Sequence, residues 1–211
     1  MGHLIYNTKE NPIIHSNIWE HSYKNKIGER EFIIFSELEI KKAILYFEKI
    51  VLAAYIPQNS KSSIKFTAYT SRLARAIYFL QSARISDDIG IKIAHFCSVF
   101  ESLFSTSTSE LRHRLSETIA NFIGIDKEDR LSIYKSLQHA YDIRSSIVHG
   151  DMISSKFTKE DYKLIFSTIT AADNILRKCF QKILDSEEIY ELFTVKTKEQ
   201  VNEFIQGLLF R

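Results

Sequence analysis

Residues 126–150, DKEDRLSIYKSLQHAYDIRSSIVHG, have the pattern of one long amphipathic helix. An aspartate such as Asp126 can accept hydrogen bonds from the first free backbone amides of a helix, and a glycine such as Gly150 often follows a helix end. Apolar and aromatic side chains recur between them at helical spacing, at Leu131, Tyr134, Leu137, Tyr141 and Val148. This stretch therefore predicts a helix that buries one face and closes at a glycine.

The segments on both sides of this stretch carry similar signals. The 211 residues include only two prolines and six glycines, which leaves long runs free for helices. Capping patterns and apolar periods predict helices at 36–56, about 65–84, 87 or 88 to about 104, 107–124, 158 to about 184, and from 197 onward. Together with residues 126–150 these make an all-α bundle of about seven helices, with no sheet in the body.

The first 35 residues differ from the rest of the chain. They are polar, contain His3, His15 and His21, and show no helical period. The short apolar run at 32–35 could be a strand or a docking segment. We expect an irregular N-terminal arm, or the remnant of a preceding module, followed by one helical domain over residues 36–211.

Composition and cysteine spacing exclude several classes of protein. A hydrophobic content of 45% and a charged content of 26% are ordinary for a soluble globular protein. Cys97 and Cys179 lie far apart without metal or redox spacing, which predicts two reduced core residues. The apolar stretch 43–56 is interrupted by Glu48 and Lys49 and is too short to span a bilayer. We expect a cytoplasmic protein without a membrane partner, a metal site or a cofactor.

Arg144 and His149 together suit the cleavage of a phosphodiester. Histidine can move protons near neutral pH, and the fixed charge of arginine can stabilise a developing phosphorane. If Gly150 ends the helix, the helix dipole favours a cationic His149. Five residues correspond to about 140° around a regular helix, so the pair would act through a distorted last turn or across a dimer. In the alternative interpretation, Arg144 pairs with Asp142 or Glu101 and His149 is a surface residue.

Two further polar residues invite an interpretation. Glu101 lies in an otherwise apolar stretch, and a buried charge needs a partner. We expect Glu101 to pair with Arg144 or Arg114, in a structural role or in support of a site. His139 is expected at the surface.

The basic residues are candidates for contacts with RNA. The net charge of +2 is too small to predict nucleic-acid binding by itself. However, Arg72 and Arg75 belong to the stretch 61–86, which contains five basic residues and no acidic one, and Arg112 and Arg114 belong to a short basic run near a predicted helix start. Each pair is interpreted either as a solvated helix face or as a contact to the RNA backbone.

The run at 141–150, YDIRSSIVHG, resembles the Arg-x4-His motif of HEPN domains, in particular the Apea-like HEPN group. Two upstream blocks, FESLF at 100–104 and ELRHRLSE at 110–117, are similar to that group in their order and separation. The resemblance covers about residues 70–180. Ser145 stands where many HEPN proteins have Asn, Asp or His.

This resemblance implies an all-helical and commonly dimeric endoribonuclease that works without a metal. Arg144 and His149 would be the catalytic pair, supported by Ser145, Asp142 and Glu101, and two copies would form one RNA-binding cleft. Since the sequence has no metal-ligand cluster, the natural nucleophile is the 2′-hydroxyl of the RNA. Its attack would leave a 2′,3′-cyclic phosphate and a 5′-hydroxyl.

HEPN enzymes occur in toxin–antitoxin, phage-defence and RNA-processing settings. The expected partners are therefore RNA, a second copy of the chain, and an antitoxin or sensor protein or domain. Two other functions are open: a catalytically silent HEPN-like module that dimerises or binds nucleotide within a larger assembly, and a helical scaffold in which the pair is coincidental.

Overall fold

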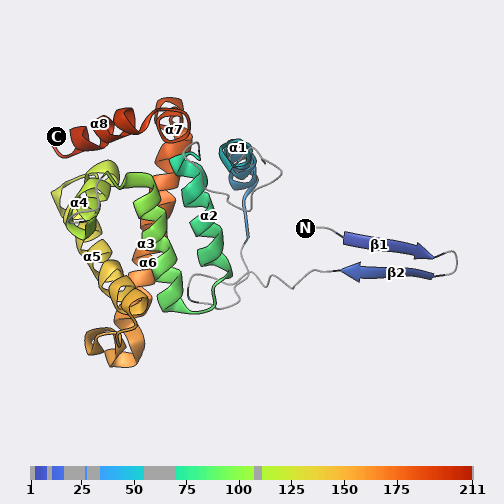
Figure 1. Ribbon diagram of the computed structural model, residues 1–211, viewed down its shortest axis with the longest axis horizontal. Coiled ribbons are helices and arrows are strands. Elements are labelled where there is room, and N and C mark those ends of the chain that lie inside the picture. The colour runs from blue at the N-terminus through green and yellow to red at the C-terminus, as the bar shows by residue number, and fades with distance from the viewer. Residues whose placement is uncertain are drawn as a thin grey trace.

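The structure is a computed structural model that describes residues 3–8, 11–16, 27, 34–54, 70–106 and 111–210. In these ranges the chain forms eight helices, so the predicted all-α bundle is confirmed (Figure 1). The helices are α1 (Glu37–Ala54), α2 (Arg72–Ile85), α3 (Ile89–Phe104), α4 (Leu111–Ile123), α5 (Lys127–His149), α6 (Ser155–Asp185), α7 (Glu187–Thr194) and α8 (Lys198–Leu208).

Local capping signals explain where several of these helices begin. Asp88 and Asp126 each accept a hydrogen bond of 2.8 Å from the backbone amide three residues later, at the starts of α3 and α5. Ser36 and Thr197 form reciprocal capping boxes at the starts of α1 and α8. These four helix starts are confirmed. The capping box predicted at 107–110 lies outside the described residues.

Two helix boundaries differ from the prediction. The helix α2 begins at Arg72 and not near residue 65, because the Ser71 hydroxyl accepts the amide hydrogen of Ala74 and caps the helix there. The short helix α7 was not predicted, although Ser186 caps it in the same way and two glutamates follow in its first turn. At eight residues, α7 is too short for its period to be recognised in the sequence.

The helix α6 is interrupted near its start, which makes the predicted continuous helix from Thr158 wrong. Residues Glu160, Asp161 and Tyr162 have φ angles of 50°, 52° and 63°, in the left-handed region. Each non-glycine residue there costs roughly 1–2 kcal/mol. A first turn at Ser155 is thereby separated from the long regular segment that ends at Asp185.

The N-terminal arm was predicted to be irregular, but part of it is ordered as a hairpin. Strands β1 (His3–Thr8) and β2 (Asn11–Ser16) pair antiparallel. The register sets Ile5 opposite Ile14 and Tyr6 opposite Ile13. Such β-branched and aromatic residues favour strands, and a two-residue link suits a hairpin. The strand suggested at 32–35 is absent at its two described residues, 34 and 35.

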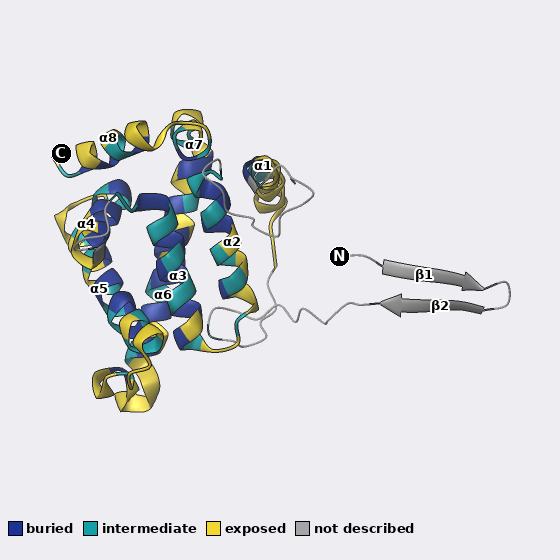
Figure 2. Ribbon diagram, in the orientation of Figure 1, coloured by how far each residue is buried: buried dark blue, intermediate teal, exposed yellow. Residues whose placement is uncertain are grey.

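The core is centred on α3, which packs against α2, α5 and α6 (Figure 1). Nine of the sixteen residues of α3 are buried, in keeping with this central position (Figure 2). Phe104 at its end lies 5.1 Å from the ring of Phe122 and 5.6 Å from that of Phe193. Full burial of one such side chain contributes about 1.5–3 kcal/mol. This packing fixes the end of α3 relative to α4 and α7, while the separate contact of α3 with α5 brings Glu101 near Arg144.

The remaining fold-level expectations concern cysteines, metals and membranes. Cys97 and Cys179 are both free and buried, as predicted. In the part of the chain that the structure describes, no three His, Cys, Asp or Glu side chains are grouped closely enough to hold a metal ion. No helix there combines the length and apolarity needed to cross a bilayer.

Candidate active site at the end of helix α5

Helix α5 is regular up to His149 and closes at Gly150. Gly150 has a φ of 73°, and its backbone N–H donates to the carbonyl oxygen of Ser146. The next amide, of Asp151, donates to the same oxygen at 2.9 Å. The predicted glycine closure is confirmed, and no distortion of the last turn brings His149 toward Arg144.

The start of α3 packs directly against this last turn. A Cβ atom added to Gly90 would lie 2.8 Å from Cδ1 of Ile147, which is closer than real Cβ contacts come. A larger residue at position 90 would push the end of the Ile147 side chain aside. Gly90 therefore lies in direct contact with the turn that carries His149.

Arg144 points toward α3, where it meets Glu101. The two side chains form an ion pair with 3.7 Å between Nη2 of Arg144 and Oε1 of Glu101, as predicted for Glu101. The Arg144 side chain is 30% exposed and that of Glu101 is 21% exposed. Because the distance exceeds that of a direct hydrogen bond, the guanidinium keeps donors for a further partner.

Opposing effects act on the pKa of the Glu101 carboxyl group. Burial raises the pKa of Glu101, while the charge of Arg144 and the hydroxyl of Tyr141 act to lower that pKa. Burial also raises the pKa of Tyr141 well above its usual range. Neither Oε1 of Glu101 nor the Tyr141 hydroxyl has a hydrogen-bond partner of standard geometry in the described chain. Arg144 is therefore the main group that stabilises the carboxylate form of Glu101.

His149 is exposed and lies on a different side of α5. On a regular helix it is rotated by about 140° from Arg144 but only about 20° from Asp142, seven residues earlier. Within the described ranges no hydrogen bond joins His149 to Arg144. One copy of the chain thus presents both groups without bringing them together. Ser145 is also exposed, beside this side of the helix.

Asp142 connects three helices on the side of α5 that carries His149. Its Oδ1 lies 2.6 Å from Nη1 of Arg112 on α4, and its Oδ2 lies 2.8 Å from Nζ of Lys156 on α6. The alternative pairing of Asp142 with Arg144 is not observed. Lys156 was not among the predicted site residues, since only the turn after Gly150 brings it back to α5.

His139 lies close to this charged group. It is half-buried, not at the surface as expected, because its ring makes an edge contact with Phe157 at 5.9 Å. Burial lowers the pKa of His139, and the charges of Lys156 and Arg112 lower it further against the opposing effect of Asp142. We call Arg112, Asp142, Lys156 and His139 the outer cluster.

The four arginines predicted to contact RNA lie in two separate places. Arg112, a member of the outer cluster, and Arg114 are both exposed on α4. Arg72 instead donates to the carbonyl oxygens of Leu103 and Ser105, at 3.0 and 2.8 Å, and to Asn202 on α8.

Arg72 thus has a structural position that was not predicted, because it caps the end of α3. Burial lowers the pKa of Arg72, as does the nearby charge of Arg75. Arg75 itself is half-buried on α2. Arg72 and Arg75 are therefore less accessible to RNA than Arg112 and Arg114, which are exposed.

Comparisons of the chain with family models, with curated proteins and with solved structures find no match. The similarity to HEPN domains therefore stays a prediction. It rests on the residues of the Arg-x4-His motif and of the two blocks that precede it.

Proposed function

We propose that this chain is a HEPN-type endoribonuclease in which Arg144 and His149 cleave RNA. One observation carries the proposal: a glycine-closed helix presents an exposed histidine and a partly exposed arginine, and that arginine is paired with a partly buried acid. A fixed cation and a proton carrier are the two groups that cleavage of an RNA phosphodiester requires of a protein.

The reaction is a transesterification within the RNA. A base removes the proton of the 2′-hydroxyl, and the oxygen attacks the adjacent phosphorus while the bond to the 5′-oxygen breaks. The leaving oxygen takes up a proton. The products are a 2′,3′-cyclic phosphate and a 5′-hydroxyl. His149 moves a proton in this sequence, and Arg144 stabilises the charge on the phosphoryl oxygens.

Two copies of the chain complete the site. Because Arg144 and His149 are about 140° apart on a regular helix, His149 of one copy acts beside Arg144 of the other. The surroundings of His149 favour such a contact, since Val148 is 56% exposed and Met152 is 94% exposed. Apolar side chains in this position are suited to an interface.

The outer cluster supplies the contact to the RNA backbone. Arg112 and Lys156 are cations held in place by Asp142, and Arg114 lies exposed on the same helix as Arg112. Phosphate groups are recognised by such fixed cations, and their binding weakens as the salt concentration rises. An antitoxin or sensor protein in a phage-defence or toxin–antitoxin setting would regulate this activity.

The test is an RNA cleavage assay in EDTA with mapping of the ends. Wild type should produce cyclic phosphate and 5′-hydroxyl ends, and Arg144→Ala and His149→Ala should not. Arg177→Ala, which removes a mostly exposed arginine of α6, is the matched control and should cleave normally. Intact RNA with every protein, or ends with a 5′-phosphate, would contradict the proposal.

The ion pair between Arg144 and Glu101 favours a second candidate function. A purely structural arginine would also pair with a partly buried acid, so this alternative is a catalytically silent HEPN-like module that dimerises or binds nucleotide. A dimer that leaves RNA intact, and whose stability falls when Arg144 is replaced, would support this second function.

A further inference from the structure

Helix α1 exposes apolar side chains around much of its circumference: Leu38, Leu45 and Leu52 lie on one side, and further apolar side chains lie on the side turned away from its contacts with Leu184, Asp185 and Glu187. Four of them, each about half exposed or more, are separated alternately by four and three residues: Ile40, Ile44, Phe47 and Val51. This spacing is that of the core positions of a coiled coil. We call these four residues the α1 stripe.

The opposite side of α1 is already bound to the bundle. Lys49 donates to the carbonyl oxygen of Leu184 at 3.0 Å and pairs with Glu187 at 2.8 Å. Tyr46 donates to Asp185 at the end of α6. These contacts fix the rotation of α1, so the α1 stripe cannot turn inward without breaking them.

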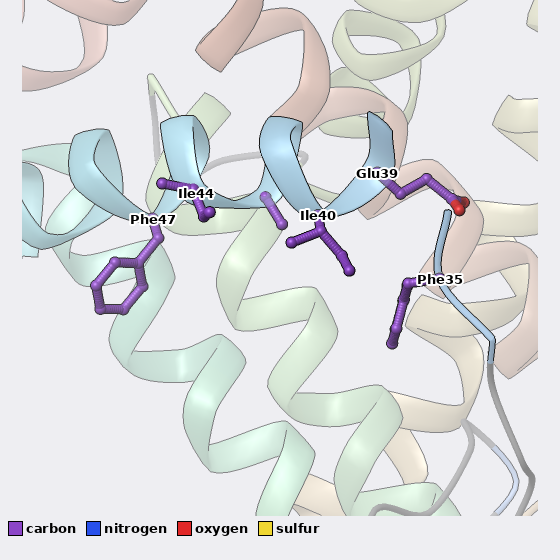
Figure 3. Close-up of a pocket in the computed structure, with 6 residues that line it drawn as sticks. Phe35, Glu39, Ile40, Ile44 and Phe47 are labelled. Carbon is purple, nitrogen blue, oxygen red and sulfur yellow. The ribbon is translucent and has the colours of Figure 1, made fainter. Parts of the chain in front are cut away.

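Three residues of the α1 stripe, Ile40, Ile44 and Phe47, help to line a hollow of about 350 Å³ (Figure 3). It is lined by Phe35, Glu39, Ile40, Ala43, Ile44 and Phe47. Residues 40, 43, 44 and 47 have the spacing of a hole that receives one side chain from a facing helix. The small side chain of Ala43 leaves room for it.

We infer that a second copy of the chain covers the α1 stripe, with the two α1 helices antiparallel. With Ile44 opposite Phe47 and Ile40 opposite Val51, Phe47 of each copy enters the hollow of the other. A two-fold axis then relates two identical surfaces, as in most dimers of identical chains.

Charged residues beside the stripe select the antiparallel arrangement. Lys41 and Glu48 lie seven residues apart on one flank of the α1 stripe. In the antiparallel pair Lys41 of each copy meets Glu48 of the other, whereas a parallel pair would set Glu48 beside Ala43. Lys41 also pairs with Glu37 of its own helix at 2.6 Å, but that pair is exposed and contributes little. Such flanking charges determine orientation more than affinity.

This interface is separate from the proposed nuclease site. The helix α1 is attached at the C-terminal end of α6, while His149 is connected to the N-terminal end of α6 (Figure 1). The regular part of α6 between them is about 34 Å long. The inference therefore does not depend on the proposed function.

The first test is the mass and association constant of the full chain by light scattering and sedimentation, for wild type and Phe47→Glu. The substitution should raise the dissociation constant of the α1 contact at least about thirtyfold. Ile125→Glu, at an exposed apolar residue of the turn before α5, is the control and should associate like wild type. Circular dichroism should show the same helix content for all three. Equal association of wild type and Phe47→Glu would overturn the inference.

The second test exchanges the charges. Lys41→Glu and Glu48→Lys each create two like-charge contacts and should weaken association roughly fivefold. The double variant restores both ion pairs and should associate within about twofold of wild type. A double variant as weak as the single ones would overturn the antiparallel pairing. If wild type is monomeric and binds vesicles of anionic phospholipid through Phe47, a membrane surface covers the stripe and the inference is wrong.

Discussion

The two ends of this bundle place their side chains in opposite ways. At the end of α5, charged side chains are partly buried and held by one another, as in the ion pair of Arg144 with Glu101. At α1, apolar side chains such as Phe47 are exposed and make a regular stripe. Each end departs from the ordinary distribution of polar and apolar residues, and such departures are where function is expected. The first end suits chemistry on a charged substrate, and the second suits contact with another protein surface.

The largest expected effect is on cleavage at the α5 end. His149→Ala should lower the rate of RNA cleavage by about 10²–10⁴-fold, the usual contribution of a proton carrier. Because His149 is exposed, its loss should leave the melting temperature nearly unchanged. The rate is measured by gel assay and the melting temperature by circular dichroism. A rate loss that merely follows a loss of folded protein would contradict a catalytic role.

The comparison of buried and exposed aromatic residues predicts the largest effect on stability. Phe104→Ala removes a fully buried ring and should lower the free energy of unfolding by about 3–5 kcal/mol. Phe47→Ala removes an exposed ring, and at concentrations where the chain is a single copy it should change that free energy by less than about 0.5 kcal/mol. Urea unfolding measures both. Similar losses for the two variants would mean that Phe47 is buried and not exposed.

Adding a methyl group at Gly90 should change the packing at the end of α5 and leave its charged residues in place. Gly90→Ala would push the end of the Ile147 side chain aside, and since alanine also favours the helix by about 0.5–1 kcal/mol, the free energy of unfolding should fall by no more than about 1 kcal/mol. A shift of the neighbouring turn, which carries His149, should also lower cleavage. Shortening the neighbour in the double variant with Ile147→Val should recover part of the stability. Gly207→Ala, where an added Cβ meets no atom within 4 Å, is the control.

The smallest expected effect is a pH dependence that originates in Glu101. Burial raises the pKa of Glu101 above its ordinary value of 4.5, so the folded chain binds this proton more tightly than the unfolded chain does. The free energy of unfolding should therefore fall as the pH rises from 4.5 through the raised pKa, and change no further above it. Glu101→Gln cannot ionise and should lack this part of the pH dependence. An unchanged pH profile in that variant would assign the effect to other groups.

Helix starts could be predicted from the sequence because capping is local. Asp88, Asp126 and Thr197 bind amides only three residues away, and Gly150 adopts its left-handed conformation at the end of the same helix. The all-α fold follows from such signals, together with the apolar periods between them. The pairing of Glu101 with a nearby arginine could also be predicted, since a charge in an apolar helix needs a partner.

Contacts between distant segments could not be predicted in the same way. Arg72 bonds to residues 31 and 33 positions away, and to Asn202, 130 positions away. No local pattern distinguishes such an arginine from one that faces RNA. The left-handed conformation of Glu160–Tyr162 could not be predicted from the sequence either, because these residue types do not favour it.

The separation of Arg144 and His149 around a regular helix affects how the proposed cleavage would depend on protein concentration. In a site completed by a second copy, only the pair of chains is active, so in dilute solution the amount of active enzyme grows with the square of the concentration. Halving the number of chains then lowers cleavage about fourfold. A ribonuclease with such a site would be inactive while it is scarce and would cleave RNA only as it accumulates.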